Sequence, residues 1–148
     1  MTRRSTISLG VLLDLPAEAT WAAVTDWPSQ SDWVMGTTVR NTAKDGAGVG
    51  GGFEAFTGIR RIGVLDPMVI TEWEPPRRVT VQHMGSVVKG IGIFEVFVLP
   101  GGRSRFVWSE ELELPLGSVG RLGWPLLRPV FALGVRRSLA KFKRSVEA

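Results

Sequence analysis

The hydrophobic and polar positions at the end of the chain follow the period of a long amphipathic helix. Apolar side chains recur every three to five residues and so share one side of a 3.6-residue helix. They are Leu127, Val130, Phe131, Val135, Leu139, Phe142 and Val146. Basic side chains occupy the other side, at Arg128, Arg136, Arg137, Lys141, Lys143 and Arg144. Because proline is tolerated in the first helical turn, we predict a helix from about Pro125 or Pro129 to Glu147.

The start of the chain alternates with a period of two, as a half-buried strand does. Its apolar positions are Ile7, Leu9, Val11 and Leu13. The basic pair before this segment and its apolar run also imitate a short signal peptide, but Asp14 interrupts the run and favours the strand. Pro16 then opens a predicted helix with Trp21, Val24 and Trp27 on its buried face. We expect one more helical turn over residues 29–33.

The middle of the chain is almost unbroken β pattern from Thr37 onward. Strands are predicted over 37–42, 53–57, 60–65, 68–73, 79–84, 88–98 and 105–114, with turns at 57–58, 75–76, 85–86 and 100–102. Asp66-Pro67 is expected to mark a bulge inside one long strand, because proline cannot donate to the ladder. Short connections favour antiparallel neighbours. The sequence therefore predicts an α+β fold, with helices on one side of a curved antiparallel sheet.

A glycine-rich stretch interrupts this β region at residues 44–52. It contains G-x-G-x-x-G at Gly46, Gly48 and Gly51, but a nucleotide-binding loop needs a hydrophobic strand before it and a helix after it. Polar residues precede the stretch and the strand-like Phe53-Glu54-Ala55-Phe56 follows it. We interpret the stretch as a flexible loop at the mouth of a cavity.

Composition narrows the class of protein. The chain has 148 residues, which fits one domain over residues 1–148 with a substantial core. The sequence has no cysteine, so disulfides, thiolate nucleophiles and cysteine metal sites are excluded. The lack of cysteine fits a reducing compartment, and we expect a cytoplasmic location.

Charge is unevenly placed along the chain. The formal net charge is +4, and the segment from Arg121 to the end carries +6, which leaves −2 for the first 120 residues. A basic helix on a mildly acidic body suggests an anionic partner, such as a membrane surface. A solvated helix face explains the same residues, and we favour it. Nucleic acid is not expected, because no DNA- or RNA-binding motif is present.

Several phrases occur in an order typical of one family. They are TWAAVTDWPSQSDWV, GVGGGFEAF, ITEWEPPRRVTV, FVLPGGRSRFVWSEELELPLG and GWPLLRPVFALGVRRSLAKFKRSVEA. The chain resembles the polyketide cyclase/dehydrase branch of the START / Bet v 1-like superfamily, SRPBCC, from Ser5 to its end. The resemblance implies a helix-grip fold, in which an antiparallel sheet curls around the C-terminal helix and leaves an apolar cavity between them. Members bind lipids, sterols, polyketides or aromatic hormones, and some catalyse cyclisation or dehydration.

In that fold, sheet residues that face the helix line the cavity. Strand alternation places Val79, Val81 and His83 inward on one strand, and two further strands offer Phe94, Val96 and Val98, then Phe106, Trp108 and Glu110. The candidate ligand-binding residues are Trp33, Phe53, Trp73, Val81, His83, Phe94, Val96, Phe106, Trp108, Glu110, Trp124, Leu127 and Phe131. A filled core is the alternative for any one of these side chains.

Two of these candidates carry acid–base chemistry. His83 is the single histidine, and a lone histidine in a strand is more often hydrogen-bonded within the structure than catalytic. Glu110 would gain a raised pKa if it pointed inward among aromatic side chains. We favour the alternative that Glu110 belongs to an acidic strand end near Arg103, Arg105 or the C-terminal helix. No convergent acid–base pair is predicted, and neither a metal nor another cofactor is expected.

These observations favour an intracellular binding or carrier domain for a hydrophobic small molecule, such as a lipid, a polyketide or an aromatic metabolite. An alternative is a polyketide cyclase, aromatase or dehydrase that uses the same cavity, with His83 or Glu110 in proton transfer. A second alternative is a protein-interaction or dimerisation module, monomer or homodimer, with Phe97 on the outer face of the sheet. Weak contact between the C-terminal helix and an anionic membrane is a further hypothesis.

Overall fold

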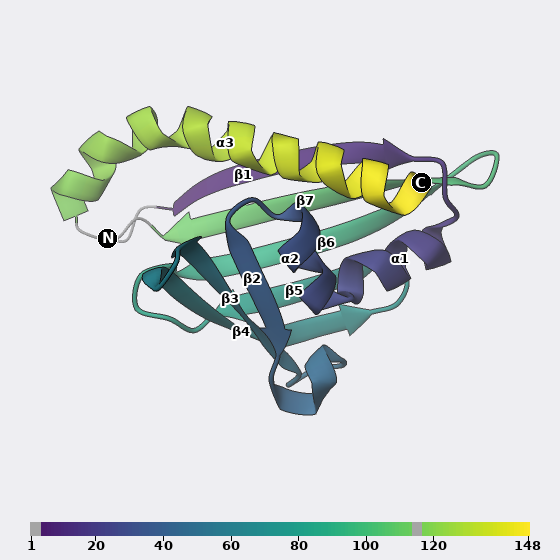
Figure 1. The fold of residues 1–148 in the computed structure, drawn as a ribbon, viewed down its shortest axis with the longest axis horizontal. Helices are drawn as coiled ribbons and strands as arrows, with labels where there is room; N and C mark the ends of the chain where they lie inside the picture. The colour runs from purple at the N-terminus through teal and green to yellow at the C-terminus, as the bar shows by residue number, and fades with distance from the viewer. Residues whose placement is uncertain (1–3, 114–116) are drawn as a thin grey trace.

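A curled antiparallel sheet forms the body of the molecule (Figure 1). This computed structural model describes residues 4–113 and 117–148, and the side chains of residues 117–122 and 124 lie outside that description. The described strands are β1 (Arg4–Leu13), β2 (Thr37–Asn41), β3 (Gly52–Ile59), β4 (Ile62–Glu74), β5 (Arg78–His83), β6 (Gly90–Leu99) and β7 (Arg103–Glu113). They form one sheet in the order β1-β7-β6-β5-β4-β3-β2, and every neighbouring pair is antiparallel.

One long helix and several short helical segments accompany this sheet. The long helix is α3 (Gly117–Glu147), and the short segments are α1 (Ala17–Thr25), η1 (Trp27–Ser29), α2 (Gln30–Trp33) and η2 (Ala43–Gly46). Figure 1 shows α3 running beside β1, with α1 and α2 on the same side of the curled sheet. The predicted α+β helix-grip fold is confirmed, including the first strand and the helical turn before β2.

The long helix begins earlier than predicted. The expected start at Pro125 or Pro129 is wrong, because α3 begins at Gly117 and contains both prolines. Each proline lacks an N–H and so removes one hydrogen bond from the helix interior. Both prolines occupy exposed positions, so their rings do not disturb packing against the sheet.

The two halves of α3 differ in burial. In the C-terminal half, Val135, Leu139 and Phe142 are buried as the apolar stripe predicts. In the N-terminal half, Leu127 and Val130 are exposed although they continue the same stripe. The sheet therefore grips only part of the helix, and the N-terminal half extends over the cavity described below.

Aromatic side chains fill one end of the molecule, which we call the packed end. It is defined by Leu13, Val24, Trp27, Phe106 and Phe142, all of them at most 1% exposed. Trp27 stacks on Phe53 with ring centroids 4.1 Å apart, and the rings of Phe106 and Phe142 lie 5.4 Å apart. Pairs in such geometry stabilise a core beyond their buried area.

The glycine-rich stretch belongs to this side of the molecule and not to a cavity mouth, so that prediction is wrong. No residue from 44 to 51 lines the cavity. The Trp27 indole N–H donates to the carbonyl of Gly46 at 2.8 Å, which ties the loop to the core. A Cβ at Gly46 would lie 2.7 Å from the Trp27 ring and the backbone has φ +70°, so only glycine fits here.

Two details of the predicted strands also differ. The turn expected at Thr57-Gly58 lies inside β3, and β3 and β4 are joined through Arg60-Arg61, with Ile59 opposite Ile62. The predicted long strand through Asp66-Pro67 exists as β4, but its register shift falls between Ile70 and Glu72. The β3–β4 register continues across Pro67, which lies opposite Glu54. The predicted end of the last strand at Leu114 lies outside the described residues.

Candidate functional site

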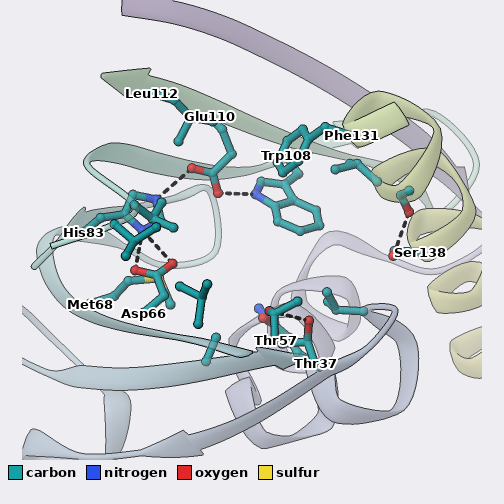
Figure 2. Close-up of a pocket in the computed structure, with 18 of the residues that line it drawn as sticks. Thr37, Thr57, Asp66, Met68, His83, Trp108, Glu110, Leu112, Phe131 and Ser138 are labelled. Atoms are coloured by element: carbon teal, nitrogen blue, oxygen red, sulfur yellow. Dashed lines mark hydrogen bonds and ion pairs between the residues drawn. The ribbon is translucent and has the colours of Figure 1, made fainter. Parts of the chain in front are cut away.

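A cavity of about 730 Å³ lies between the sheet and α3, where residues between Gly123 and Ser138 of the helix contribute to its wall. Its volume falls within the range of about 300–1,000 Å³ that is typical of small-molecule sites. The apolar part of its wall comes from several strands and from α3 (Figure 2). It includes Phe53, Ala55, Val64, Met68, Phe94, Trp108, Leu112, Leu127, Phe131 and Val135. We call this side of the molecule the cavity end.

Three ionisable side chains converge in this apolar wall, one from each of β4, β5 and β7. His83 Nδ1 lies 2.9 Å from both carboxylate oxygens of Asp66, and His83 Nε2 lies 2.8 Å from Glu110 Oε2. The Trp108 indole N–H donates to Glu110 Oε1 at 2.9 Å. Figure 2 shows the imidazole between the two carboxylates. We call Asp66, His83 and Glu110 the polar cluster.

The sheet register explains how Glu110 reaches His83 across an intervening strand. His83 on β5 pairs with Gly90 on β6, and Glu110 on β7 pairs with Gly92 on β6. A Cβ at Gly92 would lie 3.2 Å from Glu110 Oε1 and 3.1 Å from Val81 Cγ2. Gly92 therefore leaves the inner face of β6 bare between β5 and β7, and the Glu110 carboxylate occupies that space.

The geometry fixes the protonation of His83. Burial alone would lower the pKa of the imidazole, but hydrogen bonds to Asp66 and Glu110 and the charges of both carboxylates outweigh burial. The pKa of His83 rises from its ordinary value of 6.5 to about 10. The imidazole is thus a cation near neutral pH, and it donates one N–H to each carboxylate.

The structure places seven of the predicted ligand-binding residues in the wall of the cavity. They are Phe53, His83, Phe94, Trp108, Glu110, Leu127 and Phe131. The predicted inward registers of β5 and β7 agree with the buried positions of Val79, His83, Phe106 and Glu110.

Other candidates lie away from the cavity. Trp33, Val81, Val96 and Phe106 are buried in the core without lining the cavity, and Trp73 packs edge-on against Trp21 with ring centroids 5.2 Å apart. The inward direction expected for Val98 is wrong, because Val98 is 74% exposed, one residue before the end of β6. The side chain of Trp124 lies outside the described residues.

The favoured interpretation of Glu110 is wrong, as is the expectation that no acid–base groups converge. Glu110 is only 7% exposed and pairs with His83, not with Arg103, Arg105 or α3. The sequence places Glu110 in a run of acidic residues, which resembles a solvated strand end. Inward alternation after Phe106 and Trp108 was the signal for burial.

Two functional candidates were missed from the sequence. Asp66 precedes a proline and was interpreted as part of a bulge, although alternation with the inward-facing Met68 on β4 places it on the cavity wall. Gln30 on α2 lines the cavity at 5% exposure, and its Nε2 has no hydrogen-bond partner among the described residues. Its short helix gave no periodic signal for the direction of this side chain.

Neither a metal centre nor a membrane-crossing helix is found in the described parts of the chain. Residues 4–113 and 117–148 contain no group of three or more His, Cys, Asp and Glu side chains arranged to hold a metal ion. Both ring nitrogens of His83 are already engaged by carboxylates. No helix in these ranges has the length and apolar character needed to cross a bilayer.

Comparison with solved structures shows that several other proteins share the fold of this chain. The Zhui aromatase/cyclase from Streptomyces sp. R1128 superimposes with a TM-score of 0.78 at 15% identity, covering 98% of this chain and 94% of that one. The protein TTHA0849 from Thermus thermophilus gives 0.80 at 14% identity, covering 96% and 97%. A point mutant of norcoclaurine synthase from Thalictrum flavum, in complex with a transition-state analogue, gives 0.68 at 15%, covering 99% and 96%.

These identities are low enough that the structural matches establish the fold alone. A search of curated proteins finds no match in sequence. The model of the family described as polyketide cyclase/dehydrase and lipid transport matches residues 4–147, almost the whole chain. The chain therefore belongs to the polyketide cyclase/dehydrase and lipid transport family, within the START / Bet v 1-like superfamily.

Proposed function

We propose that the protein binds or carries a hydrophobic small molecule, such as a lipid, a polyketide or an aromatic metabolite, in the cavity. The observation that carries this proposal is the cavity of about 730 Å³, whose mostly apolar wall contains one polar cluster. Small-molecule sites combine apolar surroundings with a few placed polar groups in this way. A ligand that buried roughly 200 Å² of apolar surface would gain about 5 kcal/mol at about 25 cal/mol per Å².

Native mass spectrometry and solvent extraction of the purified protein test this proposal first. We expect a co-purifying hydrophobic compound, or saturable binding of the neutral fluorescent probe N-phenyl-1-naphthylamine. Phe131→Asp, which places a charge in the cavity wall, is expected to abolish probe binding. Phe97→Asp makes the same change on β6 outside the cavity and serves as the control. An empty preparation that binds neither the probe nor a panel of fatty acids, sterols and aromatic polyketides would contradict the proposal.

A second candidate function is an enzyme of the polyketide cyclase or dehydrase type, and the polar cluster favours it. Asp66 has the most accessible side chain of the cluster, at 16% exposure against 3% for His83 and 9% for Glu110. Its carboxylate is placed to accept a proton from a carbon beside a ligand carbonyl. His83 would hold this carboxylate in position and balance its charge, because both ring N–H groups are already donated.

Deuterium exchange into an aryl ketone such as 1-tetralone tests this second function without knowledge of the natural substrate. We expect the protein to accelerate exchange beside the carbonyl in D₂O, as followed by NMR. Asp66→Asn should lose the acceleration, and Glu95→Gln, on the outer face of β6, should retain it. Exchange at the same rate in the protein and in buffer would remove the reason to assign proton transfer to this cluster.

Membrane contact through the basic face of α3 remains a proposal. The structure reduces the number of basic residues that are free to take part. Arg136, Arg137, Lys141 and Arg144 are exposed, but Lys143 donates to the Leu12 carbonyl and pairs with Glu147. Beneath these basic residues, in the C-terminal half of α3, the apolar stripe is buried and not available for insertion, so we expect this face to give salt-sensitive surface association. Co-sedimentation with anionic vesicles at low and physiological salt tests it. Absence of binding at low salt would contradict the proposal.

Self-association and cellular location also remain predictions. Phe97 is 45% exposed next to the exposed Val98, which leaves an apolar spot near the end of β6. Sedimentation in dilute and concentrated samples distinguishes a monomer from a dimer. A cytoplasmic location follows only from the cysteine-free sequence, and cell fractionation tests it.

A further inference from the structure

The polar cluster is rich in hydrogen-bond acceptors and its own donors are already used. Its two carboxylates offer about eight lone-pair positions. Three donors occupy some of these positions: the two ring N–H groups of His83 and the indole N–H of Trp108. A ligand oxygen that needs a donor therefore finds none free in this cluster, whereas a ligand donor finds several acceptors.

The charge of the polar cluster also favours ligands that donate hydrogen bonds. Two carboxylates flank a single imidazole, so the sum of the formal charges is −1 with the imidazole protonated and −2 with it neutral. Two further charged residues line the cavity, Lys89 and Glu113. Glu113 forms an ion pair with Arg4, in which Oε1 and Nη2 lie 3.3 Å apart. Lys89 lies on the loop that precedes β6. In a low-dielectric apolar wall, a net negative group favours cations and donors and repels anions.

We propose that the cavity selects hydrophobic molecules whose polar end donates hydrogen bonds, as an alcohol, a phenol or a protonated amine does, and discriminates against carboxylates. This inference rests on the proposed ligand-binding function and names the ligand class. Asp66 is the contact point, because its two oxygens share one ring N–H and its side chain is the most exposed of the three. The donor of the ligand completes the hydrogen bonding of that carboxylate.

Gln30 supplies a complementary group on another wall of the same cavity. Its side chain comes from α2, it is 5% exposed, and its Nε2 has no partner among the described residues. A buried amide N–H without a partner is costly, so a ligand carbonyl or ether oxygen near it would be stabilising. A molecule with a donor at one end and an acceptor elsewhere matches both groups, and hydroxylated aromatic ketones have this combination.

A matched series of ligands tests the inference on the wild-type protein. The four compounds share a naphthalene ring and differ in the head group: 2-methylnaphthalene, 2-naphthalenemethanol, 2-naphthylmethylamine and 2-naphthoate. Each is measured at pH 7 by displacement of N-phenyl-1-naphthylamine. We expect the alcohol and the amine to bind at least tenfold more tightly than the carboxylate. A tighter amine than alcohol assigns the preference to charge, and equal affinities assign it to hydrogen bonding.

The failures of the two proposals are distinguishable in this series. Similar affinities for all four compounds, or tightest binding of the carboxylate, would overturn the selectivity while leaving a hydrophobic binding site. Failure of every compound and of the probe to bind would overturn the ligand-binding function and the selectivity with it.

Two variants locate the selectivity. Asp66→Asn removes one negative charge and supplies a donor, so the preference for the amine over the carboxylate should fall at least tenfold. Glu95→Gln makes the same change of charge on the outer face of β6, where Glu95 pairs with Arg78, and should leave the preference unchanged. Circular dichroism and urea unfolding verify that each variant is folded. An unchanged preference in folded Asp66→Asn would contradict the assignment to the polar cluster.

Gln30→Leu provides an independent check, because it removes the amide and leaves the polar cluster intact. Affinity for 6-hydroxy-1-tetralone, which has a donor and a carbonyl, should fall several-fold. Affinity for 2-naphthalenemethanol, which has no carbonyl, should not fall. Equal losses for both ligands would contradict a carbonyl contact with Gln30.

Discussion

The packed end and the cavity end are built from the same strands but differ in what fills the concave side of the sheet. At the packed end, Phe106 of β7 meets Phe142 of α3, and both are at most 1% exposed. At the cavity end, Glu110 of the same strand and Phe131 of the same helix both line the cavity, and Phe131 is 37% exposed. One strand and one helix thus contribute both to a close-packed core and to an open site.

Small residues and helix position explain the difference. The inner face of β6 carries the buried Val96 away from the cavity but Gly92, opposite Glu110, at the cavity end. Among the described side chains of α3, Val135 is the first buried one, so the apolar stripe packs onto the sheet after Gly134. The alternation of residues along a strand thus decides which face of the sheet a side chain lies on. Side-chain volume and the position of α3 decide whether the space on the concave face is filled.

The largest expected effect is a contrast in stability between the two ends. Phe142→Ala removes a ring that is 1% exposed and should lower the free energy of unfolding by about 3–5 kcal/mol. Phe131→Ala, at 37% exposure, should cost about 1 kcal/mol or less. Urea unfolding of both variants measures the contrast. Equal losses would show that the cavity end is packed as tightly as the other end.

The polar cluster makes stability depend on pH. Because the pKa of His83 is raised to about 10 in the folded state, its stabilising effect is complete below about pH 6.5 and is lost as the pH rises toward 10. The free energy of unfolding should therefore fall by several kcal/mol between pH 7 and 9.5. Asp66 and Glu110 are the charged groups in contact with the imidazole, and Lys89 and Glu113 are the other charged residues of the cavity.

His83→Gln is the matched variant for this measurement, since glutamine does not titrate. It should lose about 3 kcal/mol at pH 7, because two buried carboxylates lose their cation. Its stability should then change little between pH 7 and 9.5. A wild-type protein whose stability is flat over this range would contradict a protonated His83.

A smaller effect is expected from filling the bare face of β6. In Gly92→Ala the new Cβ would meet Glu110 at 3.2 Å and Val81 at 3.1 Å, so both side chains must shift slightly. We expect a loss of about 1–2 kcal/mol by urea unfolding. The Trp108–Glu110 contact should also be displaced, which the chemical shift of the indole N–H reports. An unchanged indole signal would contradict the role assigned to this glycine.

The sequence predicts the main strands and the long helix well, because their hydrophobic residues recur with a regular period. Alternation in residues 7–13 and 79–83 and the helical stripe ending at Val146 specify elements that the structure confirms. The start of α3 could not be placed, because proline favours a helix start and the chain tolerates Pro125 inside the helix at an exposed position.

The candidate site was only partly predictable. His83 and Glu110 were recognised as chemical candidates, but their contact depends on the pairing of β5, β6 and β7, which no local pattern encodes. Asp66 was missed, because the following proline indicated a bulge. Long-range register, and not residue type, brings these three side chains together.

The central claim is that ligands bind at the cavity end, and an NMR titration tests it most directly. Amide and indole signals of the ¹⁵N-labelled protein are followed as N-phenyl-1-naphthylamine is added. We predict that the largest shifts occur around Asp66, His83, Trp108 and Phe131, with little change around Val24 and Phe142 at the packed end. Shifts confined to the outer face of the sheet around Phe97, or no shifts at saturating probe, would contradict the account.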